Sequence, residues 1–358
     1  MMLPRVGCRT AAATALRVPS ITAPARATQP HRVAVAATQR LLCSTSDNKP
    51  SPLPPLVEEN LLGVGQVIFL GSPLCGALVL SSLGYADPWL ASLAALGTLS
   101  ATGTARALGL DVSAGLMGYN GCLVGCAFSV FLGAPAWSPA TALATVVGGA
   151  ATAPLASALK SLCGSVPQFT LAFNAVTLSV LIPFVQPLAG AAAADPNGAI
   201  TAAEWALSPL VGISQIFVVN DALSGALLLG AIGLYSPAAA AHTLAGSCVG
   251  VGTALACGAP TADIAAGLWG FNPALTALAV SVFFVPNTAS YALATGGAAG
   301  TALIFGGVKG AMAASLGVPV LTLPFCAAAI GCHLLGQRGV GGLMLAVAPH
   351  SPEKNAPP

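Results

Sequence analysis

The stretch Gly115-Leu116-Met117-Gly118-Tyr119-Asn120 recurs 152 residues later as Gly267-Leu268-Trp269-Gly270-Phe271-Asn272. A second block recurs at the same separation: Val166-Pro167-Gln168-Phe169-Thr170-Leu171-Ala172-Phe173 returns as Val318-Pro319-Val320-Leu321-Thr322-Leu323-Pro324-Phe325. Two blocks that recur in one order and at one separation indicate that the chain contains a duplicated unit.

A third pair of sites extends the duplication toward the start of the hydrophobic region. Gly65-Gln66 has a counterpart in Ser214-Gln215, 149 residues later, so the two copies differ by only a short change in length. In a chain this hydrophobic, a duplicated unit is the plan of many membrane transporters, whose substrate site lies between the two copies.

The composition predicts an integral membrane protein. Of the 358 residues, 56% are hydrophobic and 6% are charged, whereas an ordinary soluble protein has about 25% charged residues. Only ten charged residues fall between residues 60 and 340, and most stand next to glycine or proline between apolar runs. We therefore expect these charges in loops and at helix ends rather than in a buried relay.

The charge pattern also divides the chain into four regions. Residues 1–57 carry six arginines before the first acid, Asp47. This pattern is typical of an organellar transit peptide, although a disordered cytosolic tail has the same composition. The first membrane repeat is expected at 58–196, the second at 197–345 and a polar C-terminal tail at 346–358. The predicted location is a multi-pass position in the plasma membrane or in an organellar membrane.

Each repeat is predicted to begin with a helix too short to cross the bilayer. The apolar run at 61–70 amounts to roughly 15 Å of helix, about half a bilayer, which fits a re-entrant half-helix. A similar short run surrounds Gln215. Five longer apolar segments follow in each repeat, at 74–86, 88–108, 112–133, 139–162 and 168–187 in the first and at 222–235, 237–257, 264–285, 289–308 and 320–336 in the second.

An odd number of spans places the second repeat in the membrane upside down relative to the first. The predicted fold is therefore an all-α integral membrane protein with two inverted repeats, each of about five transmembrane helices plus one re-entrant half-helix. Residues near the axis that relates the repeats, such as Thr170 and Thr322, are expected to meet near the middle.

The recurring blocks supply the candidate substrate-binding residues. Each half offers an amide, flat apolar surfaces and a hydroxyl, and the residues at spacings of three and four share helix faces. None of these groups is charged, which suits a small, neutral, flat and polar solute and disfavours ions. The candidates are Gln66, Phe69, Tyr119, Leu123 and Thr170 in the first half and Gln215, Val218, Phe271, Leu275 and Thr322 in the second.

The same residues have a plainer interpretation. Aromatics and leucines at helical spacing are usually core packing, and a glutamine in a membrane helix often joins two helices. Asn120 and Asn272 can each bind solute or brace a neighbouring backbone, and bracing is the interpretation that we favour. The recurrence of three blocks in one order favours a solute pathway, although duplication also preserves structural residues.

Two other functions remain open at this point. An intramembrane serine hydrolase needs a facing serine and histidine; Ser214, Ser224, His242 and His333 are available, but no hydrolase serine motif or His-Glu-x-x-His accompanies them. We therefore expect that the chain is not an enzyme. The second alternative is a pore for another small polar solute, such as ammonia, acetamide or water.

At these blocks the sequence resembles the urea transporter family. That family carries the signature Leu-Pro-x-x-Thr-x-Pro-Phe once in each half; residues 318–325 depart from it at one position and residues 166–173 at two. The Gly-Leu-x-Gly-aromatic-Asn blocks and the starts Gly63-Val64-Gly65-Gln66 and Gly212-Ile213-Ser214-Gln215 also resemble family blocks. The resemblance spans about residues 58–340.

The resemblance implies a channel-like transporter that passes urea down its gradient without cofactor, metal or coupling ion. It implies a homotrimer in the lipid bilayer, with one pore per subunit and no nucleic-acid partner. It also implies two outer urea slots joined by a middle region lined by Thr170 and Thr322. By position, the slots are formed by Gln66, Phe69, Tyr119 and Leu123 and by Gln215, Val218, Phe271 and Leu275.

Overall fold

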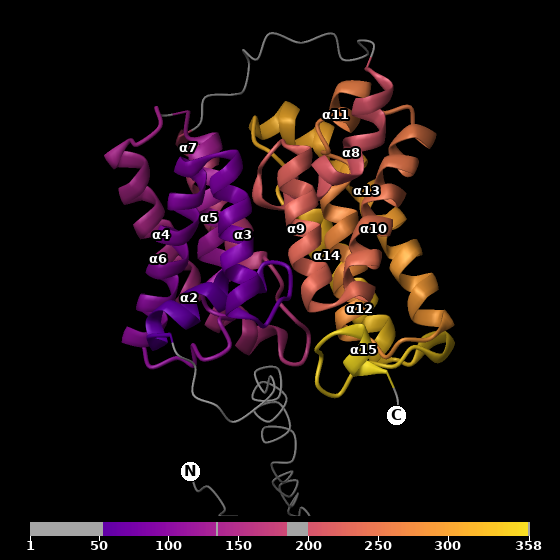
Figure 1. The fold of residues 1–358 in the computed structure, drawn as a ribbon, viewed down its shortest axis with the longest axis horizontal. Coiled ribbons are helices and arrows are strands. Elements are labelled where there is room, and N and C mark those ends of the chain that lie inside the picture. The colour runs from indigo at the N-terminus through magenta and orange to yellow at the C-terminus, as the bar shows by residue number, and fades with distance from the viewer. Residues whose placement is uncertain (1–52, 134, 185–199, 357–358) are drawn as a thin grey trace, which may run out of the picture.

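The computed structural model describes residues 53–133, 135–184 and 200–356, and every regular element in these ranges is a helix (Figure 1). Most of the predicted N-terminal segment, 1–57, and the predicted boundary between the repeats at 196 lie outside the described residues. The all-α prediction is confirmed for the part of the chain that the structure describes.

The helices of the two halves follow one another in the same order. The first half contains α2 (Pro55–Gln66), α3 (Pro73–Ala86), α4 (Pro88–Ala107), α5 (Tyr119–Phe131), α6 (Pro139–Cys163) and α7 (Leu171–Phe184). The second half contains α8 (Ala202–Ser214), η1 (Gln215–Phe217), α9 (Ala222–Tyr235), α10 (Pro237–Ala256), α11 (Thr261–Ala265), α12 (Phe271–Phe283), α13 (Thr288–Leu316) and α14 (Leu323–Gln337), and the C-terminal segment adds η2 (Val340–Gly342) and α15 (Pro352–Asn355).

Most charged residues lie at helix ends, as the sequence predicts. Asp87 caps α4 by accepting the backbone N–H groups of Trp89 and Leu90, and Asp221 caps α9 in the same way. A carboxylate there is stabilised by the unsatisfied N–H groups and by the helix dipole. Lys309 differs, because it lies inside α13 and pairs with Asp263 of α11.

The lengths of the helices show a multi-pass membrane architecture. Within the described residues, three helices, α6, α10 and α13, are each long and apolar enough to cross a bilayer. Taken together, α8 with η1 and the following α9 are also long and apolar enough to cross a bilayer. The two parts are bent by 76° relative to each other. Five shorter apolar helices pack among them, namely α3, α5, α7, α12 and α14.

Two predicted spans, 112–133 and 264–285, are wrong as continuous helices. The helices α5 and α12 begin only at Tyr119 and Phe271 and have 13 residues each, about 20 Å of length. A tight turn precedes each of them, at Gly115 with φ +70° and at Gly267 with φ +71°. A Cβ atom on Gly115 would lie 2.5 Å from the backbone N of Gly63, so glycine is required for both conformation and space.

The predicted interruption after Gln66 is present, although α2 starts earlier than expected, at Pro55. The chain leaves α2 through Phe69, which has φ +59°, and it leaves η1 through Val218, which has φ +63°. Residues 61–70 and 210–219 share one order of buried and half-buried positions. Each half therefore begins with a helix that ends at a matching position and is followed by a left-handed residue.

The two halves pack together through α3 and α9 (Figure 1). The hydroxyl oxygens of Ser82 and Ser224 lie 2.9 Å apart across this interface. The C-terminal segment then returns to the second half, where Ala346 donates to the carbonyl of Phe283 and Asn355 donates to the carbonyl of Val282. The segment predicted as a polar tail thus begins with a stretch that packs on α12.

Candidate functional site: a cavity between the two halves

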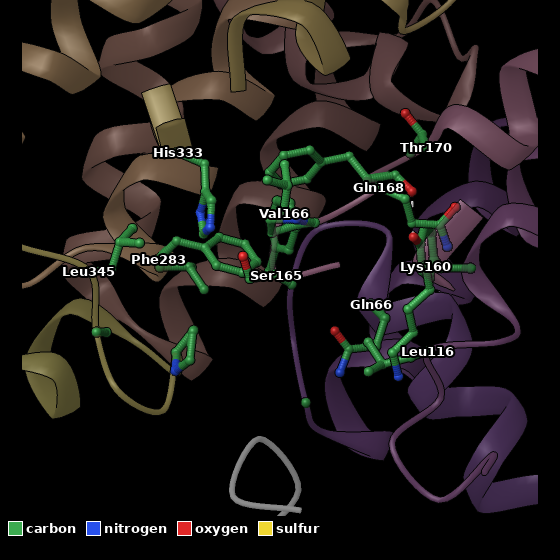
Figure 2. Close-up of a pocket in the computed structure, with 18 of the residues that line it drawn as sticks. Gln66, Leu116, Lys160, Ser165, Val166, Gln168, Thr170, Phe283, His333 and Leu345 are labelled. Atoms are coloured by element: carbon green, nitrogen blue, oxygen red, sulfur yellow. Dashed lines mark hydrogen bonds between the residues drawn. The ribbon is translucent and has the colours of Figure 1, made fainter. Parts of the chain in front are cut away.

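A cavity of about 390 Å³ lies where the two halves meet. Figure 2 shows side chains approaching it from both sides, with Gln66, Lys160 and Gln168 from the first half and Phe283 and His333 from the second. Of the ten predicted site residues, the lining includes Gln66, Phe69, Tyr119 and Thr170. The structure therefore brings the first predicted slot together, with the exception of Leu123.

The two predicted glutamines have matching hydrogen bonds. Gln66 Nε2 donates to the carbonyl of Ala114 at 3.1 Å, and Gln215 Nε2 donates to the carbonyl of Ala266 at 2.9 Å. Both side chains are half-buried. Because an amide nitrogen held in this way fixes the orientation of the side chain, the Oε1 atom of each glutamine is left to accept a hydrogen bond from a solute.

Four phenylalanine rings from both halves pack edge to face at the cavity. Phe69 and Phe169 come from the first half, and Phe283 and Phe325 come from the second. The Phe169 ring centroid lies 5.1 Å from that of Phe325 and 5.7 Å from that of Phe283. Rings at these separations attract one another beyond their buried area, so the cluster forms a rigid apolar wall.

Phe169 and its counterpart Leu321 have left-handed backbone conformations, with φ of +47° and +53°. The two halves hold these strained residues differently. The hydroxyl of Tyr119 donates to the carbonyl of Phe169, whereas the carbonyl of Leu321 accepts from Asn272 Nδ2 at 3.1 Å. Such conformations cost about 1–3 kcal/mol and persist where the surroundings hold them, often at functional sites.

The preference for bracing by Asn120 and Asn272 is confirmed. Asn120 Oδ1 accepts the backbone N–H of Phe173 at 3.0 Å, and Asn272 Oδ1 accepts that of Phe325 at 3.3 Å. Both side chains are fully buried. Each asparagine therefore fastens the first turn of a threonine-bearing helix rather than lining the cavity.

Thr170 and Thr322 meet, as predicted. Their hydroxyl oxygens lie 2.6 Å apart, and both residues are buried. Thr170 also lines the cavity. The two hydroxyls bond each other directly, so no solute fits between them in this structure.

The other predicted residues lie outside the lining of this cavity. Leu123 is buried in the main apolar core, and Leu275 is buried in the same core. Phe271 begins α12 and packs edge to face on Phe305, with ring centroids 6.1 Å apart. Gln215 begins η1 and Val218 follows its last residue, and both are half-buried.

The expectation of a lining without charge is wrong at one end of the cavity, because Lys160 lines it (Figure 2). Lys160 lies in the last turn of α6, and its long stem lets the ammonium group reach the space while the backbone stays in the helix. Sequence reasoning missed it because a lysine at a helix end is usually solvated. It also omitted Phe169 from the candidates, although that residue precedes the threonine in a recurring block.

The C-terminal segment contributes to the mouth of the cavity through Leu345, Ala346, Pro349 and His350. The His350 ring stacks on Tyr235 with a centroid distance of 5.4 Å. Glu353 accepts from the hydroxyl of Ser236 at 2.6 Å and from the N–H of Ala238 at 2.9 Å. These contacts hold the segment against the ends of α9 and α10.

Two groups in this segment have displaced acidities. Burial, and then the nearby Lys354 ammonium, lower the pKa of His350. Burial alone would raise the pKa of Glu353, but the hydrogen bonds from Ser236 and Ala238 outweigh it and lower that pKa. Both shifts favour docking of the segment at neutral pH.

Comparison with known proteins agrees with this geometry. A sequence model of the family described as "Urea transporter" matches residues 57–337. The chain belongs to the urea transporter family. It is 34% identical over 311 residues to urea transporter 1 of Ovis aries, covering 81% of this chain and 79% of that protein. It is 35% identical over 293 residues to urea transporter 1 of Rattus norvegicus, covering 75% and 74%.

Membership of the urea transporter family settles the enzyme alternative. The family consists of transporters, so the prediction that the chain is not an enzyme is confirmed. The candidate hydrolase serines are also engaged elsewhere: the Ser224 hydroxyl contacts that of Ser82, and the Ser214 hydroxyl donates to the carbonyls of Val211 and Val219.

Proposed function

We propose that the chain carries urea passively across a membrane, through a passage that opens where the two halves meet. The observation that supports this most directly is the cavity that combines Gln66, edge-on phenyl rings and Thr170. Family membership and relatives named urea transporter 1 point to the same solute.

The chemistry of the cavity suits urea. Urea is flat and neutral, it has one carbonyl acceptor, and it has four N–H donors. Gln66 Oε1 can accept its N–H groups, while rings such as Phe69 and Phe169 contact its faces. A small cation would lose its hydration without receiving a fixed counter-charge, which is strongly unfavourable. No cofactor, metal or coupling ion enters this scheme.

The duplicated units at 58–196 and 197–345 are proposed to be inverted repeats, each with about five spans and a re-entrant half-helix. Contacts across the halves come in exchanged pairs, which supports a two-fold relation. Thr170 contacts Cys326 Sγ at 3.2 Å, and its exchanged counterpart is Asn174 with Thr322, at 2.8 Å. In Figure 1, α2 and α8 lie toward opposite ends of the molecule.

The inversion has its own test. A cysteine placed at Val57 and one placed at Ala203, both exposed near the starts of α2 and α8, are expected to react with a membrane-impermeant thiol reagent from opposite sides of a vesicle. Reaction of both from the same side would contradict the inversion.

We propose two slots on either side of the threonine pair. The matching amide contacts of Gln66 and Gln215, and the matching positions of Tyr119 and Phe271 at the starts of α5 and α12, support this symmetry. In the second slot, Val218 replaces the ring of Phe69 with a smaller wall. The proposed residues are Gln66, Phe69, Tyr119, Leu123 and Thr170, with Gln215, Val218, Phe271, Leu275 and Thr322.

The assembly is proposed to be a homotrimer in the lipid bilayer. Exposed apolar side chains such as Leu143, Val147, Tyr291 and Leu303 lie along α6 and α13, and a surface of this kind is covered by lipid or by a neighbouring subunit. Light scattering of the purified protein, corrected for detergent, is expected to give three times the 34.9 kDa of one chain.

The membrane is proposed to be the plasma membrane or an organellar membrane. Cell fractionation of the tagged protein distinguishes the two.

Stopped-flow measurement of solute uptake by proteoliposomes tests the function. Urea uptake is expected to exceed that of empty liposomes clearly, with no dependence on a sodium or proton gradient. Parallel runs with acetamide, ammonium and water test the alternative pore. Uptake of urea no faster than in empty liposomes, with rapid uptake of one of the other solutes, would overturn the proposal.

A further inference from the structure

The Asn174 side chain bonds both central threonines, and its register partner in the second half is Cys326. It lies in the first turn of α7 and is 1% exposed. Asn174 Nδ2 donates to the carbonyl of Thr170 at 2.8 Å and to the hydroxyl oxygen of Thr322 at 2.8 Å. Asn174 Oδ1 accepts the backbone N–H of Thr322 at 3.2 Å.

Two backbone groups fix the orientation of this amide. The carbonyl of Thr170 can only accept a hydrogen bond, and the N–H of Thr322 can only donate one. Turning the amide over would place two acceptors together at Thr170 and two donors together at Thr322. The NH₂ group of Asn174 therefore faces the hydroxyl of Thr322, where it can only donate.

This orientation sets the order of the hydroxyl protons. Because Thr322 Oγ1 accepts from Asn174, its own proton is free to point at Thr170 Oγ1, 2.6 Å away. The Thr170 proton then points at Cys326 Sγ, 3.2 Å away. In this order each hydroxyl proton has an acceptor, whereas in the reverse order the Thr322 proton can turn only toward Cys326 Sγ, whose short contact of 3.2 Å is with Thr170.

We propose that Asn174 is a positioning residue that gives the threonine pair a fixed polarity, with Thr322 as donor and Thr170 as acceptor toward the solute. The inference rests on the proposed transport of urea through this pair. When the threonines part, the Thr322 hydroxyl donates to the carbonyl oxygen of urea, and the Thr170 oxygen accepts a urea N–H. The pair is thereby matched to a solute that carries one acceptor and several donors.

Thiourea is the probe for this polarity, because it keeps the N–H donors of urea but replaces the carbonyl oxygen by sulfur, a much weaker acceptor. The quantity measured is the ratio of urea flux to thiourea flux in proteoliposomes, which does not depend on the amount of protein. We expect Thr322→Val and Asn174→Ala to lower this ratio by about threefold to tenfold, the range for one lost neutral hydrogen bond. Thr170→Val is expected to reduce both fluxes and to keep the ratio.

A matched control lies one turn further along α7. Thr177 is fully buried, and its hydroxyl has no hydrogen-bond partner in the described residues, so Thr177→Val is expected to leave the ratio unchanged. The double variant Asn174→Ala/Thr322→Val is expected to equal Thr322→Val alone, because Asn174 acts through that hydroxyl. If Asn174 had a purely structural role, the decreases in the flux ratio caused by the two substitutions would add in the double variant.

The outcomes separate this inference from the proposed function. If the wild-type protein carries no urea, the function fails before any variant is compared. Suppose instead that the wild type carries urea, that the ratio of urea flux to thiourea flux falls in Thr170→Val, and that it is unchanged in Thr322→Val. The polarity of the pair is then reversed and the inference is overturned. Should Asn174→Ala not fold, Asn174→Cys takes its place, since cysteine occupies the matching position in the other half, and the comparison of the two threonine variants needs no change at Asn174.

Discussion

The ring of Phe169, from the first half of the chain, lies 5.7 Å from the ring of Phe283, from the second half, at an interplanar angle of 81°. This contact joins the apolar walls that the two halves contribute to one cavity. We expect this ring cluster to act as a constriction on the way to the threonine pair and to limit the size of the solutes that reach it.

Removing one ring of the constriction should relax size selection. Phe283→Ala is expected to raise the flux of N,N′-dimethylurea relative to urea several-fold, because the ring that blocks the bulkier solute is gone. Proteoliposome flux measurements with both solutes check this. Phe128→Ala removes a ring of the same size from the buried core, away from this cavity, and an equal change in that variant would contradict a specific role for Phe283.

The charge of Lys160 should disfavour cations at the mouth of the cavity. Guanidinium has the planar shape of urea but carries a positive charge and has an NH₂ group in place of the carbonyl oxygen, so the effect of charge is read by comparing its inhibition between variants. Repulsion of about 1–3 kcal/mol is expected between unit charges roughly 6–15 Å apart at an effective dielectric constant near 20. Lys160→Met is therefore expected to strengthen inhibition of urea flux by guanidinium about tenfold, and Lys160→Arg is expected to leave it weak. Equal inhibition constants in all three proteins would contradict this.

Acidification should release the C-terminal segment. The pKa of His350 is lowered in the docked state, so its contribution to docking is complete above the ordinary histidine value of about 6.5 and is lost as pH falls through the docked value. The pKa of Glu353 is also lowered, so a further loss follows below about pH 4.5. The hydrogen-exchange protection of residues 343–356, measured relative to the intrinsic rate at each pH, is expected to fall between pH 7.5 and pH 5.

A control for this pH dependence keeps the aromatic contact. His350→Phe retains a flat ring against Tyr235 but does not titrate, so the protection of its segment should change little between pH 7.5 and pH 5. If protection falls equally in the wild type and in this variant, titration of His350 does not govern docking.

The turn at Gly115 should be sensitive to any side chain. Gly115→Ala is expected to destabilise the protein by about 2 kcal/mol or more, because a left-handed alanine is strained and its Cβ would meet the backbone of the neighbouring half-helix. Gly109 has a similar φ of +68° but open space around it. Gly109→Ala therefore reports the strain alone, and thermal unfolding in detergent compares the two. Equal destabilisation would show that the close approach contributes nothing.

Much of the fold was predictable because its signals are local. The segment 88–108 was expected from the apolar run after Asp87-Pro88, and α4 spans Pro88–Ala107, since an N-cap acid followed by proline marks a helix start. The meeting of Thr170 with Thr322 was predicted from the recurrence of the block that contains them. For Asn120 and Asn272 the sequence supported only a preference for bracing, and the structure shows which backbone groups they brace.

The remainder depends on contacts between distant segments. The late starts of α5 and α12 arise because Gly115 and Gly267 turn against backbone that lies about 50 residues earlier, at Gly63 and Gly212. The approach of Phe283 to Phe169 requires the final packing of the two halves, which no local pattern contains. Lys160 was missed for the same reason, because its helix position is ordinary and only the tertiary fold brings its side chain to the cavity.

The most direct measurement is stopped-flow urea uptake by proteoliposomes that contain the wild-type protein or the Thr170→Val/Thr322→Val variant, at equal amounts of folded protein. Valine keeps nearly the same shape but removes both central hydroxyls, and two lost hydrogen bonds of about 1 kcal/mol each correspond to a roughly 30-fold slower flux. The account predicts a loss of that order. Wild-type urea flux in the double variant would show that the solute does not pass between these two residues.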